Sequence, residues 1–256
     1  MLERREAILQ RIKEEGRVNV SELSREMNIS AVTIRSDIRS MDSEGLLRRV
    51  RGGAVAVRDA EQPQELPYPS LSQHVPEKRA IAERADRYID DGDTIFLDDA
   101  STTYYLAEKI RENTQRHLNV VTNCLSIAVL FWNRPNIELY MVGGSVGGNM
   151  PSTVGGEAAA WIEKIRVEKA FIGVHGLNMD VGLTSVASPQ MLVKKAILKA
   201  ARETYVMADS SKFDNGYLSV ICPAEEVHMI ITDSGISPED RKKAESKKLP
   251  LVIVDV

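Results

Sequence analysis

Residues 3–55 read ERREAILQRIKEEGRVNVSELSREMNISAVTIRSDIRSMDSEGLLRRVRGGAV, and this stretch decides the fold of the N-terminal part. Apolar residues recur at helical spacing in three places, and the last of these helices is expected to end at Gly45. The segment LLRRVRGGAVAV then predicts two short strands around Gly52 and Gly53. The residues placed to cap helices are Gly16, Ser21 and Ser30. The stretch therefore predicts three helices followed by a hairpin.

The second and third helices are joined by a tight turn at Asn28-Ile29, which is a helix-turn-helix pattern. Ile34, Ile38 and Met41 share one stripe of the third helix and are expected to face the core. Side chains on its other face would meet base edges, and the hairpin arginines would meet phosphates or a minor groove. For Arg35 taken alone, a solvated arginine on an exposed helix is an equal alternative. The residues expected to contact DNA are Ser30, Val32, Thr33, Arg35, Ser36, Arg39, Arg48, Arg49 and Arg51.

Charge is unevenly divided along the chain, whose 256 residues carry a net charge of −4. Residues 1–58 hold 12 Lys and Arg against 9 Asp and Glu, whereas the remainder holds 21 against 28. A small basic module on an acidic body fits contact with DNA, since phosphate attraction supplies most non-specific affinity. The N-terminus lacks a signal-peptide pattern, no apolar run could span a bilayer, and two cysteines are too few for a disulfide framework. These features indicate a cytoplasmic protein without a membrane partner.

Residues 59–76, DAEQPQELPYPSLSQHVP, contain four prolines and no periodicity, so they predict a linker. It separates a winged helix-turn-helix domain, residues 1–58, from a larger domain, residues 77–256. In the larger domain apolar runs alternate with helical stretches, which predicts an α/β fold with a parallel sheet covered on both faces. The expected strands are 94–98, 118–122, 137–142, 169–173, 204–208, 229–232 and 251–254. The expected helices are 77–90, 101–112, 124–132, 155–165 and 188–203.

Three of the expected strands are followed by small polar or glycine residues. Ser101, Thr102 and Thr103 begin a helix, where hydroxyl donors and free backbone N–H groups form an anion site. Helix capping by Ser101 or Thr102 is the simpler alternative. Thr122-Asn123 and Gly143-Gly144 follow the next two strands. Because ligands of open parallel sheets bind beyond the carboxyl ends of the strands, we expect a shared pocket there.

Both parts of the chain resemble one family. In the N-terminal part, R-R-x-x-I-L, V-x-V-x-E-L, S-x-x-T-I-R-x-D-I and G-L-L-R-R-V-x-G-G-A look like the winged helix-turn-helix of the DeoR family of sugar-metabolism regulators. Over residues 77–233, the pieces GDTIFLD, ASTT, VVTN, MVGG, KAFIG, GLT, VKKAIL, ADSSKF and IITD resemble the family's sensor domain. The resemblance implies a transcriptional repressor of a carbohydrate-utilisation operon. A phosphorylated sugar would release it from its operator DNA.

The resemblance also implies a fold and a ligand site for the sensor domain. That domain is similar in fold to ribose-5-phosphate isomerase, with a phosphate loop that corresponds to ASTT. Ser101, Thr102 and Thr103 would bind the phosphate. The residues lining the sugar side would be Asp98, Thr122, Asn123, Gly143 and Gly144. The residues closing the pocket would be Lys194 and the loop of Asp209, Ser211 and Lys212, with His175 and Gly176 beside it.

The chain departs from the family pattern at three places. Ser36 stands where a second Arg usually follows T-I-R, which leaves the operator sequence open. The family commonly shows G-x-D-G after the KAFIG strand, whereas residues 173–176 are Gly-Val-His-Gly. An acidic pair usually precedes the Val-Lys of the next helix, but residues 189–192 are Pro-Gln-Met-Leu. His175 is therefore either a specificity residue for an unusual ligand or an ordinary loop histidine.

A sugar-phosphate isomerase with an attached DNA-binding module is the rival interpretation. Its base and assisting lysine would come from the two places that hold His175 and residues 189–192, although Asp98, Asp99 and Asp209 remain. A nucleotide-binding oxidoreductase is a second rival, but Ser145 occupies the second required glycine of G-x-G-x-x-G. The four histidines are scattered along the sequence. We therefore expect a regulator rather than an enzyme, without cofactor or metal.

One recognition helix buries too little surface for tight and specific operator binding. Two-fold operators mirror two-fold proteins, so we expect a homo-oligomer, either a dimer or a larger assembly. Binding of the sugar phosphate would change DNA affinity through a coupling between the two sites. The linker would transmit that change, and the sequence does not say how.

Overall fold

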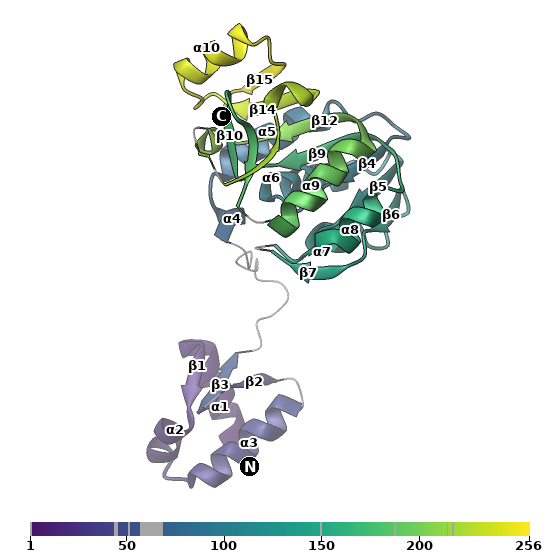
Figure 1. Cartoon of the computed structure of the whole chain (residues 1–256). Helices are drawn as coiled ribbons and strands as arrows, with labels where there is room; N and C mark the ends of the chain where they lie inside the picture. Colours follow the sequence, from purple (N-terminus) through teal and green to yellow (C-terminus); the bar gives the residue numbers. More distant parts are fainter. Residues whose placement is uncertain are drawn as a thin grey trace. The chain divides into compact units, whose positions relative to one another are not determined.

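The computed structural model describes residues 2–43, 46–50, 52–56, 69–148, 150–186, 188–213, 215–216 and 218–256. The chain divides into two compact units, Met1–Glu65 and Leu66–Val256 (Figure 1).

The first unit has the expected three helices and hairpin. Its helices are α1 (Leu2–Glu15), α2 (Val20–Glu26) and α3 (Ala31–Ser43). Its strands are β1 (Arg17–Asn19), β2 (Leu47–Val50) and β3 (Gly53–Ala56), which form an antiparallel sheet in the order β1-β3-β2. Ile34, Ile38 and Met41 are at most 1% exposed, which confirms the predicted core stripe of α3. The expected end of α3 at Gly45 lies outside the described residues.

One local prediction in this unit is wrong, and one is confirmed. Helix α2 is capped by Asn19, whose side-chain oxygen accepts the Ser21 N–H at 2.8 Å, so Ser21 is inside the helix rather than its cap. The short strand consequently ends at Asn19. Ser30 does cap α3, because its hydroxyl accepts the Thr33 N–H at 3.2 Å.

Gly53 serves strand packing rather than the turn itself. It already belongs to β3, where it pairs with Val50 on one side and with Asn19 on the other. A Cβ atom at Gly53 would lie 1.9 Å from the carbonyl oxygen of Val18. A glycine is therefore required for β1 to approach β3 closely enough to pair.

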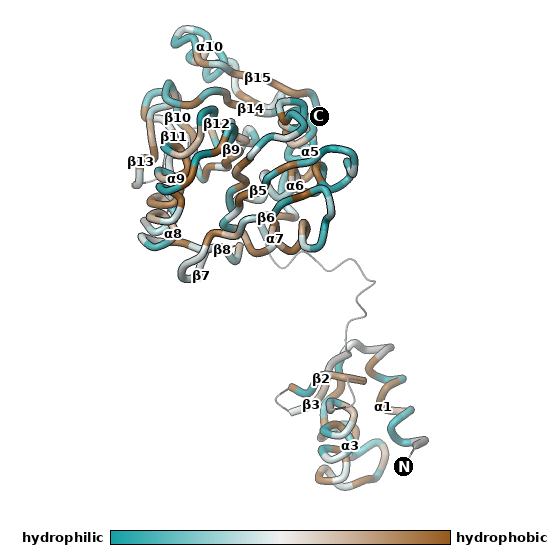
Figure 2. The backbone as a smooth tube through the Cα atoms, turned by 90° about the vertical axis from the view of Figure 1, so that its right-hand side faces the viewer, coloured by the Kyte–Doolittle hydropathy of each residue, from teal (hydrophilic) through white to brown (hydrophobic). Residues whose placement is uncertain are grey.

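The second unit is built on a seven-stranded sheet in the order β15-β14-β12-β9-β4-β5-β6. Every neighbouring pair is parallel, which confirms the predicted parallel sheet. The strands are β4 (Thr94–Leu97), β5 (Leu118–Thr122), β6 (Ile137–Met141), β9 (Val167–Gly173), β12 (Ala201–Met207), β14 (Met229–Asp233) and β15 (Leu251–Val254). Figure 2 shows the hydrophobic character of β14 and β15 against the hydrophilic α10 (Pro238–Ser246).

Helices cover both faces of this sheet. One face packs against α4 (Pro69–Ser72), α5 (Val75–Asp86), α6 (Ser101–Glu112) and α7 (Leu125–Phe131). The other packs against α8 (Gly155–Ile162), α9 (Ser188–Ala200) and α10. Among the described residues, no helix is long and apolar enough to cross a membrane.

Several elements of the second unit were not predicted. They are the hairpin of β7 (Ser145–Gly147) and β8 (Ser152–Val154), the antiparallel sheet of β10 (Gly176–Asn178), β11 (Gly182–Ser185) and β13 (Ser219–Cys222), and α10. Part of the expected linker is also helical, since α4 begins at Pro69 and Pro76 lies in the first turn of α5. A proline suits the first turn of a helix because its N–H would be unpaired there anyway. The remainder, residues 59–68, lies outside the described residues.

The strand order creates one crevice at the carboxyl ends of the strands. The chain starts at β4 in the middle, proceeds outward through β5 to β6, and then returns to β9 on the other side of β4. Strands β4 and β9 therefore lead into loops that run in opposite directions. In open parallel sheets, ligands bind at such a switch point.

Candidate functional site

The outer face of α3 presents exposed side chains. Val32 is 73% exposed, and Arg35, Ser36 and Arg39 are exposed as well. These positions recur at intervals of three or four residues, so they share one face of the helix. Thr33 is half-buried and its hydroxyl lies 2.8 Å from that of Ser30, at the start of the same helix.

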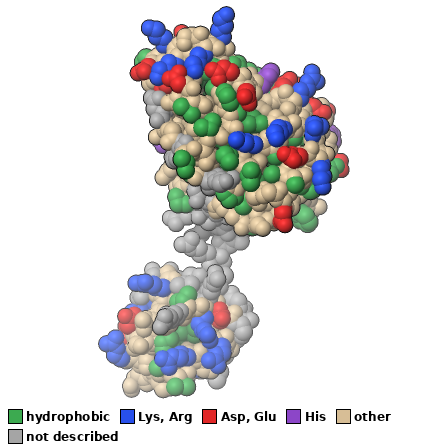
Figure 3. Space-filling model, in the orientation of Figure 1, with side chains coloured by type: hydrophobic (Ala, Val, Ile, Leu, Met, Phe, Trp, Pro, Cys, Tyr) green, Lys and Arg blue, Asp and Glu red, His purple; other side chains and the backbone are tan. Residues whose placement is uncertain are grey.

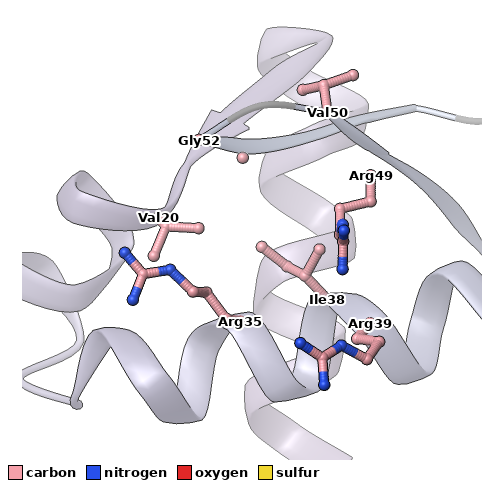
Figure 4. A pocket seen from close by; sticks show the side chains of 8 residues that line it. Val20, Arg35, Ile38, Arg39, Arg49, Val50 and Gly52 are labelled. Atoms are coloured by element: carbon pink, nitrogen blue, oxygen red, sulfur yellow. The ribbon is translucent and has the colours of Figure 1, made fainter.

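A hollow of about 280 Å³ separates α3 from the hairpin. Figure 4 shows Arg35 and Arg39 of α3 and Arg49 of β2 around it. Among the described residues, none of these three guanidinium groups has an ion-pair partner. Arg48 belongs to β2, but its side chain is not described, and Arg51 lies outside the described residues. Figure 3 shows that the visible face of this unit carries mostly basic side chains among its charged groups.

Helix α3 is held against α1 by a buried carboxylate. Asp37 of α3 is 5% exposed, and its two oxygens lie 2.5 Å from Nε of Arg4 and 3.7 Å from Nε of Arg5. The hydrogen bond from Arg4 to Asp37 raises the pKa of Arg4. The Arg-Arg pair of the R-R-x-x-I-L motif and the Asp of the T-I-R-x-D-I motif thus contact each other. Their role is to fix the direction in which α3 presents its outer face.

In the second unit, a cavity of about 110 Å³ lies at the switch point between β4 and β9. Five of the residues predicted for a ligand site line it, namely Ser101, Thr102, His175, Lys194 and Lys212. The other lining residues are Ser70, Asp99, Ala100, Met150, Gly173, Val174, Gln190 and Met207. The cavity therefore brings together the loop after β4, the loop after β9, the start of α9 and the short helix η1 (Ser210–Lys212).

The N-terminus of α6 opens into this cavity uncapped. Its N-cap residue is Ala100, in an extended conformation, and no side chain of the described residues caps the helix. The simpler alternative, capping by Ser101 or Thr102, is therefore wrong. The first backbone N–H groups of a helix have no partner inside the helix, and the helix dipole adds positive potential there. An anion in the cavity can take up these donors.

Asp98 is enclosed beneath the cavity and does not line it. One of its carboxylate oxygens accepts the Ala100 N–H at 3.1 Å and the Thr103 hydroxyl at 2.7 Å. The other accepts the Gly173 N–H at 2.9 Å and the Lys194 ammonium. Lys194 also donates to the carbonyl oxygen of Gly173 at 2.8 Å. These contacts join the ends of β4 and β9 to α9.

The pKa of Lys194 is set by its burial and by two neighbouring carboxylates. Its burial favours the neutral amine, but the carboxylates of Asp98 and Asp99 outweigh that effect, so the pKa of Lys194 is raised. Asp99 is the carboxylate that faces the cavity. It accepts the Ser152 hydroxyl at 2.7 Å and the Gln190 amide at 3.3 Å, and its other oxygen lies 3.9 Å from the Lys194 ammonium.

The loop after β12 carries Lys212 to the cavity. Asp209 begins η1 as its N-cap and accepts the Ser211 N–H at 3.2 Å. Asp233, at the end of β14, accepts the Ser210 N–H at 2.6 Å. The ADSSKF and IITD pieces of the sequence therefore meet in space, and together they hold Lys212 in place.

His175 lies in the wall with its ring largely buried. Its Nδ1 is 3.3 Å from the Ser185 hydroxyl. Burial, followed by the charge of Lys194, lowers the pKa of His175. Burial therefore favours the neutral form of the imidazole. Gly176 follows it outside the cavity lining, where a Cβ would lie 1.7 Å from the carbonyl oxygen of Asn215.

The remaining predicted ligand residues lie outside the cavity lining. Thr122 accepts the Cys124 N–H at 3.0 Å, and the Asn123 amide donates to the Thr153 carbonyl at 3.1 Å, so both are buried between β5 and β8. Gly143 and Gly144 are exposed in the turn before β7. That turn leads into a strand rather than a helix, so it lacks the helix N-terminus of a dinucleotide site.

Within the described residues, no three His, Cys, Asp or Glu side chains are grouped to hold a metal ion. Sequence reasoning missed Ser70, Met150, Gln190 and Met207 as cavity residues. Ser70 and Gln190 come from segments without any ligand motif. Asp99 was visible in the sequence beside Asp98, and only the structure distinguishes which of the two faces the cavity.

Two protein-family models match the chain. Residues 4–60 match the DeoR-like helix-turn-helix domain, and residues 73–234 match the DeoR C-terminal sensor domain. The chain belongs to the DeoR family of transcriptional regulators. This confirms the resemblance inferred from the sequence motifs.

Relatives of this DeoR-family regulator span nearly its whole length. It is 33% identical to the HTH-type transcriptional regulator YulB of Bacillus subtilis, over 98% of this chain and 96% of the relative. It is 28% identical to a putative aga operon transcriptional repressor of Escherichia coli O157:H7, over 98% and 93%. It is 26% identical to the lactose phosphotransferase system repressor of Staphylococcus aureus, over 99% and 98%.

Among solved structures, the chain is similar to ribose 5-phosphate isomerase A of Methanocaldococcus jannaschii. The identity is 20%, the TM-score is 0.38, and 53% of each chain is covered. At that TM-score the likeness has no bearing on activity.

Proposed function

We propose that this DeoR-family protein is a repressor of a carbohydrate-utilisation operon that leaves its operator DNA when a phosphorylated sugar binds. Family membership and the two relatives named as aga and lactose system repressors support this proposal. The observation that carries it is the cavity at the switch point. There the uncapped N-terminus of α6 and the side chain of Lys212 face one cavity. The first unit separately bears the basic hollow between α3 and the hairpin.

The cavity has two chemically different ends in this proposal. Ser101, Thr102 and Lys212 offer N–H, hydroxyl and ammonium donors, which suit a phosphate. Asp99, Gln190 and neutral His175 offer acceptors and donors that suit sugar hydroxyl groups. Asp98, Thr103, Thr122, Asn123 and Asp209 would support the wall from behind, because their side chains are buried against protein.

On the DNA side, Arg35, Arg39 and Arg49 around the hollow would contact the operator together with Val32 and Ser36. A bidentate arginine contact to guanine contributes specificity, while contacts to phosphate contribute affinity. The first unit alone is a single recognition module of the size that buries about 600–1,000 Å² on DNA. Tight operator binding therefore requires a second copy, and we propose a homo-oligomer.

An isomerase remains the second candidate because of one observation. Asp99 lies 3.9 Å from Lys194 in the cavity wall, and a carboxylate base assisted by a lysine suits aldose–ketose isomerisation. Against it, Lys194 is already hydrogen-bonded to Asp98 and Gly173, and Asp99 holds Ser152 and Gln190. Lys194 and Asp99 are thus both engaged in hydrogen bonds that stabilise the cavity wall. This engagement favours sensing over catalysis.

The test is a thermal-shift screen of the full chain against sugar phosphates, each paired with its unphosphorylated sugar. A ligand at 100 times its dissociation constant stabilises the folded state by about 2.7 kcal/mol, which is a readily measured shift. We expect one phosphate to raise the melting temperature, its free sugar to have no effect, and operator binding to weaken in its presence. Stabilisation by free sugars only would overturn the phosphate site. Conversion of the bound phosphate to its keto or aldo isomer, followed by NMR, would establish the isomerase instead.

A further inference from the structure

The wall of the effector cavity includes the first described segment after the DNA-binding unit. Helix α4, Pro69–Ser72, is the first element of the second unit in the chain, and its Ser70 lines the cavity. Leu71 is 1% exposed and packs into the core between the sheet and α5 and α6. The chain that comes from the DNA-binding unit therefore enters the second unit at its ligand cavity.

Two side chains hold this segment by its carbonyl groups. The ammonium of Lys78 donates to the carbonyl oxygen of Ser70 at 2.6 Å and to that of Gln73 at 2.7 Å. The hydroxyl of Tyr105 donates to the carbonyl oxygen of Leu71 at 2.6 Å. A four-residue helix cannot satisfy its own last carbonyl groups. Lys78 and Tyr105 therefore supply the hydrogen bonds that keep α4 in the wall.

Lys78 is an unusual residue to find in this position. Only 2% of its surface is exposed, and among the described residues no carboxylate lies within ion-pair distance of its ammonium. Burying an ammonium is costly, and a well-packed apolar side chain is often as stable or more stable in such a place. Burial lowers the pKa of Lys78, while the charge of Asp209 raises it and that of Lys212 lowers it. The charge of Lys78 thus interacts with the charged side chains of the same loop that brings Lys212 to the cavity.

We propose that residues 69–73 are the segment through which an occupied cavity acts on the DNA-binding unit, with Lys78 as the positioning residue that holds them in the cavity wall. The inference rests on the proposed function, because it requires a ligand in this cavity. A ligand that contacts Ser70 fixes or shifts α4, and α4 leads directly into the chain that ends in the DNA-binding unit. Lys78 touches neither ligand nor DNA in this scheme.

Hydrogen–deuterium exchange of the full chain, with inorganic phosphate as the probe, tests the first step. At ten times the dissociation constant of phosphate, we expect exchange of the amides of residues 101–104 and of residues 70–75 to slow by about tenfold. Residues 113–117 lie in the loop before β5, at the opposite ends of the strands, and serve as the internal control. Protection of residues 101–104 alone would overturn the inference and leave the phosphate site standing. Protection of neither segment would overturn both.

The second step is tested with Lys78→Met and its matched control Lys169→Met. Lys169 is 9% exposed and its ammonium binds Asp90 and Asp93 at 2.6 and 2.7 Å, near the amino end of β9 and remote from the cavity. Both variants lose a buried lysine in the same unit. Any general effect of lower stability therefore appears in both.

The measured quantity is the ratio of operator dissociation constants with and without the sugar phosphate that stabilises the wild type. The operator is a duplex selected from a random library by the wild-type protein. We expect a ratio of about 5 to 150 for the wild type and for Lys169→Met, and a ratio near one for Lys78→Met with ligand binding retained. Lys78→Arg, which can donate to the same carbonyl groups, is expected to restore part of the ratio. An undiminished ratio in Lys78→Met would overturn the role of Lys78.

Discussion

Lys194 and Asp98 are 96 residues apart in the sequence, and the ammonium of one donates a hydrogen bond to the fully buried carboxylate of the other. Both are also bonded to the backbone of Gly173, at the end of the neighbouring strand β9. The pair thus fastens α9 to the two strands between which the cavity lies. Cavity geometry consequently depends on a contact that no ligand needs to touch.

Replacing Lys194 by Met is expected to lower the free energy of unfolding of the second unit by about 3–5 kcal/mol, because it leaves the Asp98 carboxylate buried without a cation. Urea denaturation followed by circular dichroism measures this change. The control is Lys195→Met, since Lys195 is exposed on the same helix. Equal stability of the two variants would show that the pair does not anchor α9. Combining Lys194→Met with Asp98→Asn is expected to cost less than the two single changes added together.

Replacing Arg35 by Ala is expected to weaken operator binding by about 1–3 kcal/mol, since it removes a guanidinium group from the exposed face of α3. Fluorescence anisotropy with labelled operator measures the loss, and ligand-induced thermal shifts are expected to be unchanged. Arg202→Ala removes the same charge from an exposed site of the second unit and is the control. Operator binding as tight as that of the wild type would remove α3 from the DNA interface.

Replacing Thr102 by Ala is expected to weaken sugar-phosphate binding about tenfold or more, because a hydrogen bond to a charged group contributes about 1.5–3 kcal/mol. In the proposed function, the variant is expected to stay on its operator when the sugar phosphate is added. Thr103→Ala is the informative comparison, since that hydroxyl is bonded to Asp98 and does not line the cavity. It is expected to lower stability while its ligand titration stays near that of the wild type. The reverse pattern, measured by calorimetry, would exchange the roles of the two threonines.

His175 gives the second unit a pH dependence with a definite sign. Burial lowers the pKa of His175 in the folded state below its ordinary value near 6.5, so the unfolded chain binds the proton more tightly. Stability is therefore full above pH 6.5 and falls as the pH drops from there toward the folded-state pKa. Denaturation midpoints at pH 7.5 and at pH 5.5 are expected to differ less in His175→Asn than in the wild type. An identical difference in the two proteins would contradict the neutral, buried imidazole.

Replacing Gly53 by Ala is expected to destabilise the first unit by about 1–3 kcal/mol, because the new Cβ would collide with the Val18 carbonyl and push β1 away from β3. Operator binding would weaken while the melting of the second unit stays the same. Gly143→Ala is the matched control, since a Cβ at that position meets no atom within 4 Å. Calorimetry of both variants measures the difference, and a normal first unit in Gly53→Ala would refute the close approach.

The seven parallel strands could be predicted because each is a short apolar run bounded by polar residues. The start of β12 could not be predicted from the sequence. Residues 201–203, Ala-Arg-Glu, favour a helix by propensity, and the expected helix ran through them. In the structure α9 ends at Ala200, and Ala201 already pairs with Val167 of β9. Sheet pairing between segments distant in sequence outweighs the local preference there.

The candidate site was predictable where a motif marks a strand end, as at Ser101 and Thr102. The site was not predictable where the direction of a side chain decides whether the residue lines the cavity. Asp98 and Asp99 are adjacent at the end of β4, and successive side chains of an extended chain point to opposite sides. One is therefore enclosed and the other faces the cavity. Gln190 and Ser70 reach the same wall only because α9 and α4 fold back onto the strand ends, which no local pattern records.

The cavity wall is assembled from several short segments of the chain, and the Asp98–Lys194–Gly173 contact fastens the ends of β4 and β9 to α9. Positions such as His175 and Gln190, which take no part in that contact, can therefore change one at a time while it stays intact. In the proposed function, a few substitutions in the wall can therefore give a duplicated copy of the regulator a different effector. A new specificity can therefore evolve in this fold without loss of the contacts that stabilise it.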